Sequence, residues 1–215
     1  MNSVAPPELI DELLTPRPSD ASEDTLGERI LDAAFEQFRL LGIRRSSMED
    51  IARRAGVGRV TIYRRFESKE RLVQSLLLRE CQRGIAFVEA STAHVTGIEE
   101  GVVETFLAAM SVIRKHPLVL GLLEKEPETI LPLLTVKASL GVTIGRAYVA
   151  QKVRTARRAM GLPEDDAEQI GEVYARLALS LVLTPKTCLP VDDDEPAREF
   201  ARRYIVPMVT RKIAP

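Results

Sequence analysis

The chain has 215 residues, of which 45% are hydrophobic, 28% are charged and only 5% are aromatic. No apolar run approaches the roughly 18 residues of a membrane-spanning helix, and the N-terminus lacks a secretory-signal pattern, so we expect a cytoplasmic protein with no membrane partner. The net charge of −1 argues against a nucleic-acid partner at first sight, but residues 29–83 carry a net charge of +6 and residues 1–28 a net charge of −6, so the neutrality is a cancellation between segments.

Residues 1–24 combine prolines with Ser, Asp and Glu, which predicts a disordered acidic arm, more often a solvated tail than a functional segment. From Thr25 the spacing of apolar residues becomes helical, and Gly42 supplies a stop. The apolar residues that share one face of this first helix are Ile30, Ala34, Phe38 and Leu41.

Two short helices are predicted next. Ser47 and Asp50 have the spacing of a capping box, which opens a helix that must end by Gly56. A second helix is expected from about Gly58 to Phe66. Two short helices joined by a tight turn, the second of them basic, are the sequence form of a helix-turn-helix.

The remaining elements are also predicted to be helices. Ser68 caps a long helix that starts at Lys69, and a later apolar stripe ends at His116. Pro127 and Pro132 are expected to break the stretch that follows. A further helix, ending at about Gly161, is marked by Val136, Leu140, Ile144 and Tyr148.

The last two predicted helices span about residues 164–183 and 195–210. The centre of the first, Leu177 to Leu183, is apolar on every side and must therefore be covered on every side. The two helices carry more apolar surface than one chain needs, which predicts a homodimer with a four-helix interface. The second helix is defined by Phe200, Tyr204 and Met208.

Residues 28–80, and above all SSMEDIARRAGVGRVTIYRRFESKERLV, resemble the DNA-binding domain of the tetracycline-repressor (TetR) family. The resemblance implies an all-α fold, with an N-terminal three-helix helix-turn-helix domain at residues 25–83 and a C-terminal helical bundle for ligand binding and dimerisation at residues 84–215. It also implies a ligand-responsive regulator, most often a repressor, that leaves a near-palindromic operator when a small effector binds. One departure from the family pattern is Gly58, where members often have Ser or Thr.

The chemistry of the side chains suggests which of them contact DNA. Arg59 suits guanine, the Thr61 methyl suits a thymine methyl, and Val60 adds an apolar contact. Ser47 begins a helix whose N–H groups can hold a phosphate, so its hydroxyl can cap, contact DNA, or do both. The resemblance assigns the Tyr63 hydroxyl to a phosphate. The remaining candidates are Gly58 as a close backbone approach, Lys69 as a phosphate anchor, and Arg44, Arg64 and Arg65 as backbone or base contacts.

Less specific interpretations of some residues stay open at this point. Tyr63 could be a packing residue with its hydroxyl at the surface, and Arg53 and Arg54 fit a solvated helix face better than a site. A pocket for a lipophilic effector could be lined by four residues, although each of them is better explained as core. These residues are Phe106, Met110, Tyr148 and Tyr174.

No enzyme, metal or cofactor site is predicted. His94 and His116 have no nucleophile and partner acid nearby, and the two cysteines are too few for a four-ligand zinc site. The run Asp192–Asp194 lacks EF-hand spacing and is better explained as a solvated loop. The alternative to a regulator is a helical ligand-binding or scaffold protein of the same fold without DNA binding.

Overall fold

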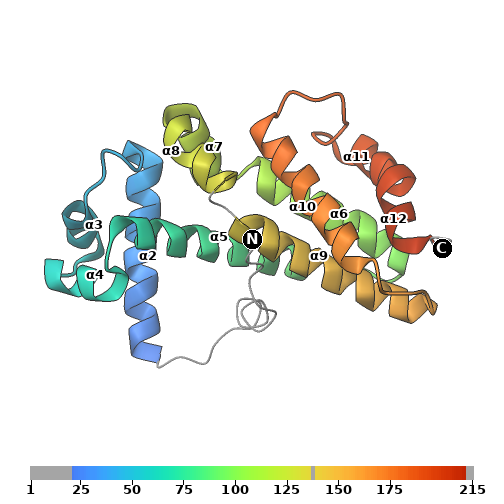
Figure 1. The fold of residues 1–215 in the computed structure, drawn as a ribbon, viewed down its shortest axis with the longest axis horizontal. Helices are drawn as coiled ribbons and strands as arrows, with labels where there is room; N and C mark the ends of the chain where they lie inside the picture. Colours follow the sequence, from blue (N-terminus) through green and yellow to red (C-terminus); the bar gives the residue numbers. More distant parts are fainter. Residues whose placement is uncertain (1–20, 137–138, 212–215) are drawn as a thin grey trace. The chain divides into compact units, whose positions relative to one another are not determined.

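The computed structural model describes residues 21–136 and 139–211, and every regular element within these stretches is a helix (Figure 1). The fold is therefore all-α, as predicted. The helices are α2 (Ala21–Leu41), α3 (Met48–Ala55), α4 (Arg59–Phe66), α5 (Lys69–Thr92), α6 (Ile98–Arg114), α7 (Pro117–Lys125), α8 (Pro127–Leu134), α9 (Ser139–Met160), α10 (Ala167–Leu183), α11 (Asp194–Phe200) and α12 (Val206–Thr210), with a π-helical turn at Ala201–Ile205.

The described residues form two compact units. The first, here called the helix-turn-helix unit, comprises residues 21–81 and 116–136, and the second, here called the bundle unit, comprises residues 82–115 and 139–211. Helix α5 contributes residues to both. By packing, α7 and α8 belong to the helix-turn-helix unit, although they follow residue 83 in the sequence.

The core of the helix-turn-helix unit is a single apolar cluster. Ile51 of α3, Ile62 of α4 and Leu72 of α5 are fully buried in it, and Leu118 and Leu122 bring α7 into the same cluster. The expected apolar face of α2 is buried at Ile30, Ala34 and Phe38. Leu41, the last residue of α2, is 45% exposed, so its assignment to that face is wrong: the helix ends there and the chain turns away.

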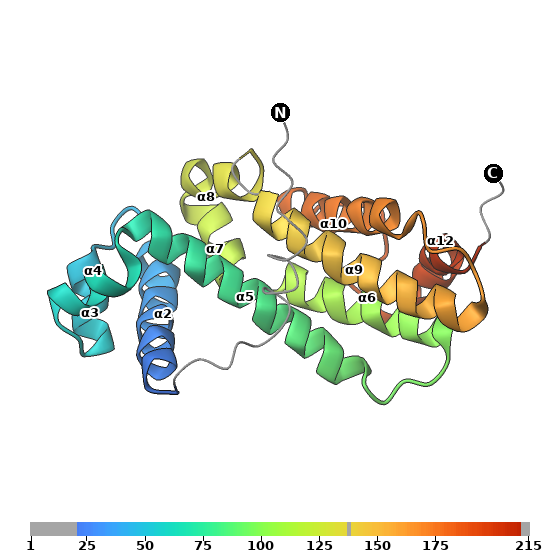
Figure 2. The same cartoon turned by 60° about the horizontal axis from the view of Figure 1, so that its bottom comes forward.

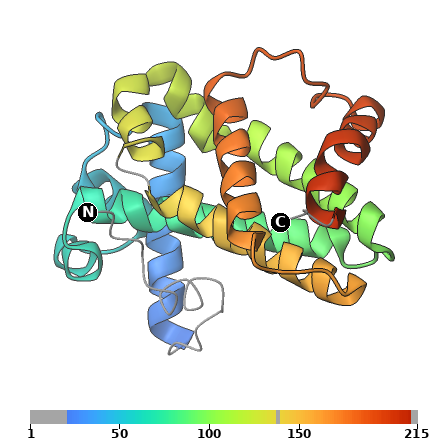
Figure 3. The same cartoon turned by 45° about the vertical axis from the view of Figure 1, so that its right-hand side comes forward.

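The bundle unit has two apolar clusters. Helix α6 packs against α10, α11 and α12 around Phe106 and Met110, while α9 packs against α10 around Val153 and Ile170. Helices α9 and α10 lie side by side (Figure 2). Residues 184–193 form the long loop that joins α10 to α11 (Figure 3).

The structure corrects three expected boundaries. Residues 1–20 of the predicted arm lie outside the described residues, whereas residues 21–24 already belong to α2. Acidic side chains stabilise the first turn of a helix, so their presence does not exclude a helix there. Pro132 lies inside α8 and does not break it. A proline removes one backbone hydrogen bond of the helix, and the burial of the Ile130 side chain compensates this loss. Val136 is 89% exposed and precedes α9.

The last predicted helix is not a uniform α-helix. A π-helical turn at residues 201–205 separates α11 from α12, and Pro207 follows it. Proline has no N–H and its ring crowds the carbonyl four residues earlier, so the wider turn accommodates it. The Tyr174 hydroxyl of α10 donates to the Ile205 carbonyl of this turn at 3.0 Å.

Helix α10 is not covered on every side within one chain. Leu181 and Val182 are buried, whereas Leu177 and Leu179 are only half-buried. Val173 on the same helix is 50% exposed. A single chain therefore covers only part of this apolar segment.

Candidate nucleic-acid interface

The first helix of the helix-turn-helix begins with the predicted capping box. The backbone N–H of Asp50 donates to the Ser47 hydroxyl at 3.1 Å, and the hydroxyl donates to the Asp50 carboxylate at 2.6 Å. The hydroxyl and the backbone N–H of Ser47 both donate to the Asp50 carboxylate, and these two hydrogen bonds lower the pKa of Asp50. The cap fixes the start of α3, with its first-turn N–H groups at a helix N-terminus, where an anion is favoured.

The predicted tight turn is also present. Gly56 adopts a left-handed conformation with φ +66°, which a residue with a Cβ tolerates poorly. The N–H of Val57 donates to the Ala52 carbonyl at 2.9 Å, and Arg29 of α2 donates to the Ala55 carbonyl at 2.8 Å. The turn thus ends α3 and directs the chain into α4.

Helix α4 presents the predicted basic face outward. Ile62 and Phe66 are buried against the rest of the unit, and Thr61 is half-buried. Gly58 is the N-cap and gives no side-chain hydrogen bond, so the N-cap position of α4 presents only backbone atoms. The exposed residues of α4 are Arg59, Val60, Tyr63, Arg64 and Arg65.

An acidic residue of α3 that the sequence did not single out contacts this face. The carboxylate of Glu49 on α3 is 3.1 Å from Nε of Arg59, and the Tyr63 hydroxyl donates to it at 3.4 Å. The Arg59 guanidinium also lies over the Tyr63 ring, 5.6 Å from its centroid. Because Glu49 faces Nε, the two terminal nitrogens of Arg59 stay available for a bidentate contact. The spacing of fourteen residues between Glu49 and Tyr63 crosses a turn, so no helix periodicity could have revealed the contact.

The outer candidates have partners of their own. Arg44 forms an exposed ion pair with Glu128 at 2.7 Å. The Lys69 ammonium donates to the carbonyls of Ile43 and Ser46 at 3.1 and 3.2 Å. It therefore holds the loop between α2 and α3. Arg65 lies over the Phe66 ring. The structure therefore brings Arg59 and Tyr63 together beside Glu49, and it gives Lys69 a role in holding the protein's own backbone.

Arg53 and Arg54 do not both behave as a solvated face. Nε of Arg54 donates to Gln37 of α2 at 3.0 Å, while Arg53 pairs with Asp50 one turn earlier. These four side chains line a shallow surface hollow of about 300 Å³. Gln37 is a buried residue of α2, whereas the other three belong to α3, so the hollow lies between these two helices.

The candidate effector residues are divided between two places. Phe106 and Met110 are buried in the same apolar cluster of the bundle unit, and Tyr174 packs against it. Tyr148 lies elsewhere, beside Glu89 and beneath the Lys152 ammonium at 5.7 Å. Burial raises the pKa of both tyrosines, and the Glu89 carboxylate raises that of Tyr148 further. The structure thus brings three of the four candidates together.

Titratable groups in the described stretches do not form a metal site, since no group of three or more His, Cys, Asp or Glu side chains is close enough to hold an ion. Asp192 pairs with Arg114 at 2.5 Å. The His116 ring caps α7 by accepting from the Val119 N–H at 3.4 Å. Among the described helices none is by itself long and apolar enough to cross a membrane, although the bent pair α6 and α7 passes that test together by length and composition.

Comparison with known proteins matches both parts of the chain to one family. The model of the bacterial regulatory proteins of the tetR family matches residues 30–76, and that of the bacterial tetracyclin repressor C-terminal domain matches residues 95–203. The HTH-type transcriptional regulator AlkX of Mycobacterium tuberculosis is 30% identical over 196 residues, which are 90% of this chain and 89% of that protein.

Solved structures share the fold. The TetR family repressor AlkX from Dietzia sp. strain DQ12-45-1b, implicated in biodegradation of n-alkanes, aligns with a TM-score of 0.64 and 19% identity over 91% of this chain and 97% of that chain. The transcriptional repressor QsdR of R. erythropolis aligns with a TM-score of 0.58 and 19% identity over 89% of this chain and 99% of that chain.

Proposed function

Because this chain belongs to the TetR family of bacterial transcriptional regulators, we propose that it is a dimeric repressor that leaves a near-palindromic operator when a small lipophilic effector binds. The observation that carries the DNA-binding part is the outward basic face of α4, set against a capped α3. Residues 25–83 would form the DNA-binding domain and residues 84–215 the effector-binding and dimerisation domain.

Each candidate contact has a proposed role on DNA. Arg59 reads guanine through its terminal nitrogens, and Thr61 and Val60 meet thymine methyl groups. The backbone at Gly58 approaches the groove, while the Ser47 end of α3 and the Tyr63 hydroxyl bind phosphates. Lys69 is better placed as an anchor of the α2–α3 loop than as a free phosphate ligand. The proposed backbone contacts at the margin are Arg44, Arg64 and Arg65.

The homodimer is supported by apolar surface that the single chain leaves open. Val173 on α10 and Tyr204 on the π-helical turn are 50% and 54% exposed, and Leu177 is only half-buried. Pairing α10 and residues 194–210 with the same segments of a second copy would cover them in a four-helix interface. A two-fold dimer places two copies of α4 about one DNA turn or a multiple apart, which is why a near-palindrome is expected.

Selection of genomic DNA fragments bound by the purified protein tests this function. We expect the enriched fragments to share one near-palindromic site, and a gel shift with that site to show sequence-selective binding. Recovery of fragments without a common site would leave the alternative, a helical binding protein of the same fold that has lost specific DNA binding. The genes next to the enriched site would also indicate the effector.

The lipophilic effector is supported by the apolar environment of Phe106, Met110 and Tyr174 and by the likeness to AlkX, whose Dietzia structure is tied to n-alkane degradation. We expect long-chain fatty acids or alkanols to raise the melting temperature, since a ligand present at 100 times its Kd adds about 2.7 kcal/mol to stability. A thermal-shift panel measures this. Stabilisation by polar metabolites with none by lipophilic compounds would contradict the prediction.

Release from DNA is proposed to pass through α5, because this helix contributes residues to both units. Effector binding would favour a conformation in which α5 is tilted and the two copies of α4 no longer match the operator spacing. Crystal structures of the free and effector-bound dimers test it. Equal separation of the two copies of α4 in both would remove the proposed mechanism.

A further inference from the structure

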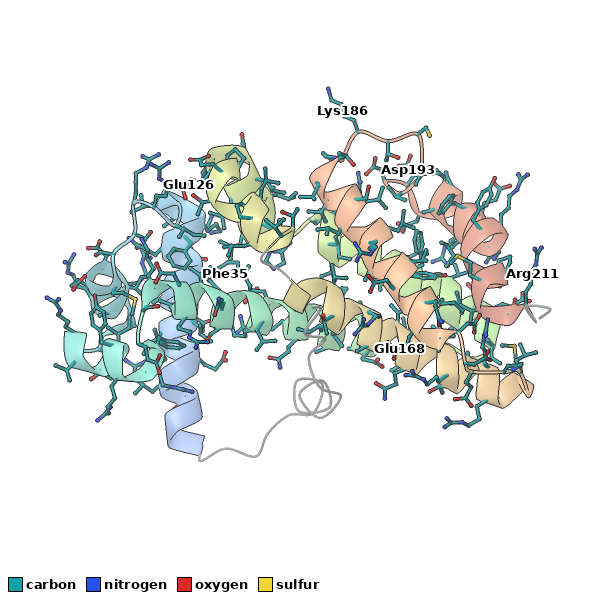
Figure 4. All side chains as sticks on the ribbon, viewed as in Figure 1. Phe35, Glu126, Glu168, Lys186, Asp193 and Arg211 are labelled. Carbon is teal, nitrogen blue, oxygen red and sulfur yellow. The ribbon has the colours of Figure 1, made fainter. Side chains whose placement is uncertain are left out.

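A buried carboxylate joins the α7–α8 corner to the loop that leads into the helix-turn-helix. Glu126, between α7 and α8, is only 5% exposed, and its carboxylate accepts from the backbone N–H groups of Ile43 and Arg44, each at 3.1 Å. Figure 4 shows Glu126 beside the C-terminal end of α2. An ionised carboxylate is costly to bury unless hydrogen bonds compensate it, and here two backbone donors of one loop do so.

Gly42 leaves the room that this carboxylate occupies. A Cβ added at Gly42 would overlap Oε1 of Glu126, so a side chain at position 42 and the carboxylate cannot share the space. Gly42 also has φ +83°, a left-handed conformation that disfavours other residues. The glycine that ends α2 therefore also admits Glu126 to the loop.

Further hydrogen bonds hold this loop and the end of α2 in place. Lys125 donates to the Arg39 carbonyl at 3.0 Å, at the end of α2. The Ser46 hydroxyl donates to the Gly42 carbonyl at 2.6 Å. The Lys69 ammonium holds the Ile43 and Ser46 carbonyls from the α5 side. The loop ends at Ser47, the N-cap of α3, so these hydrogen bonds fix where the N-terminus of α3 lies.

We propose that Glu126 is a positioning residue for DNA binding: its carboxylate fixes the backbone at residues 42–44 and thereby places Arg44 and the N-terminus of α3 against the DNA phosphates. This inference rests on the proposed DNA-binding function. Glu126 acts through the loop and does not touch DNA itself, and phosphate contacts set the register of a protein on the duplex. The segment 116–136 is thus part of the DNA-binding machinery, although it lies outside residues 25–83.

The test compares three full-length variants on the operator recovered with the wild-type protein. Glu126→Gln removes the negative charge; when the amide oxygen takes the place of Oε2, the N–H₂ group takes that of Oε1, which now accepts from the Arg44 N–H at 3.3 Å. Gly42→Ala displaces the same carboxylate from the other side. Glu124→Gln removes an equal charge from an exposed position on α7 and serves as the matched control. For each protein we measure operator affinity by fluorescence anisotropy between 50 and 200 mM salt, together with the melting temperature.

Glu126→Gln and Gly42→Ala are expected to weaken operator binding by at least about tenfold while folded, and to flatten the slope of log K against log salt by about 0.9 for each DNA phosphate that the variant no longer binds. Glu124→Gln should bind as the wild type does. An unchanged salt slope, with affinity reduced only in proportion to the unfolded fraction, would show a merely structural residue and overturn the inference. If Glu126→Gln does not fold at the assay temperature, Gly42→Ala decides. Failure of the wild type to bind any site selectively would refute the proposed function instead.

Discussion

Arg59→Ala is expected to weaken operator binding by between about thirtyfold and twenty-thousandfold. A bidentate contact from arginine to guanine is worth about 1–3 kcal/mol, the proposed dimer would make two of them, and about 1.4 kcal/mol corresponds to a tenfold change in affinity. Arg59 is 72% exposed and fits this contact because Glu49 lies against Nε. Competition of specific and non-specific duplexes in fluorescence anisotropy measures both the affinity and the specificity ratio.

Two further variants separate base reading from charge at this site. Arg59→Lys keeps the positive charge but loses the planar fork, so non-specific binding should be retained while the specificity ratio falls. Arg158→Ala is the matched control, because Arg158 is also exposed and its Nε pairs with a glutamate, Glu164, but it lies on α9 in the bundle unit, away from the proposed dimer interface. Full specificity in Arg59→Ala would show that another residue of α4 reads the bases.

The second large effect is expected for stability. Arg157 of α9 is only 2% exposed and donates to the carbonyls of Val209, Met208 and Pro163 at 2.9, 3.1 and 3.0 Å. It also forms an ion pair with Asp166 at the start of α10. One guanidinium thus fastens the end of α12 and the α9–α10 turn to α9, and no local pattern in the sequence indicated it.

Arg157→Met is expected to lower the free energy of unfolding by about 3–5 kcal/mol, because it leaves a carboxylate and three carbonyls without their buried donor. A chain of this length should then melt about 6–20 °C lower, at about 2–4 °C per kcal/mol. Thermal and urea unfolding followed by circular dichroism measure the change. The neighbouring Arg158→Met is the control: Arg158 pairs with Glu164 at the surface, and an exposed pair contributes at most about 1 kcal/mol. Equal melting of the two variants would refute the role of Arg157.

Local patterns predicted the parts of the helix-turn-helix that depend on neighbouring residues. The Ser47–Asp50 capping box, the Gly56 turn and the boundaries of α3 and α4 all agree with the sequence. Each of these features is decided within about one helical turn, by backbone geometry and by hydrogen bonds between residues three to five positions apart. The same locality explains why the outward face of α4 could be assigned from its spacing.

Contacts between distant parts of the chain could not be predicted in this way. The Glu126 carboxylate meets a loop that lies 82 and 83 residues away in sequence, and Arg79 is buried between Glu28 and Asp32 of α2, about 50 positions earlier. In the sequence alone, nothing distinguishes Glu126, which is buried, from the nearby Glu124, which is exposed. For the same reason, the position of α7 and α8 in the sequence did not indicate that they pack with the helix-turn-helix.

The sequence by itself determined the all-α class, the family resemblance and the residues of α4 that face outward, because helix periodicity and capping are local properties. Only the tertiary structure decided which partners these residues have. It placed Glu49 beside Arg59 and Tyr63, turned Lys69 toward the α2–α3 loop, and set Glu126 beneath that loop. Charge sums by segment located the candidate DNA-binding helices, but the interactions that hold them in place depend on which side chains the packed core brings together.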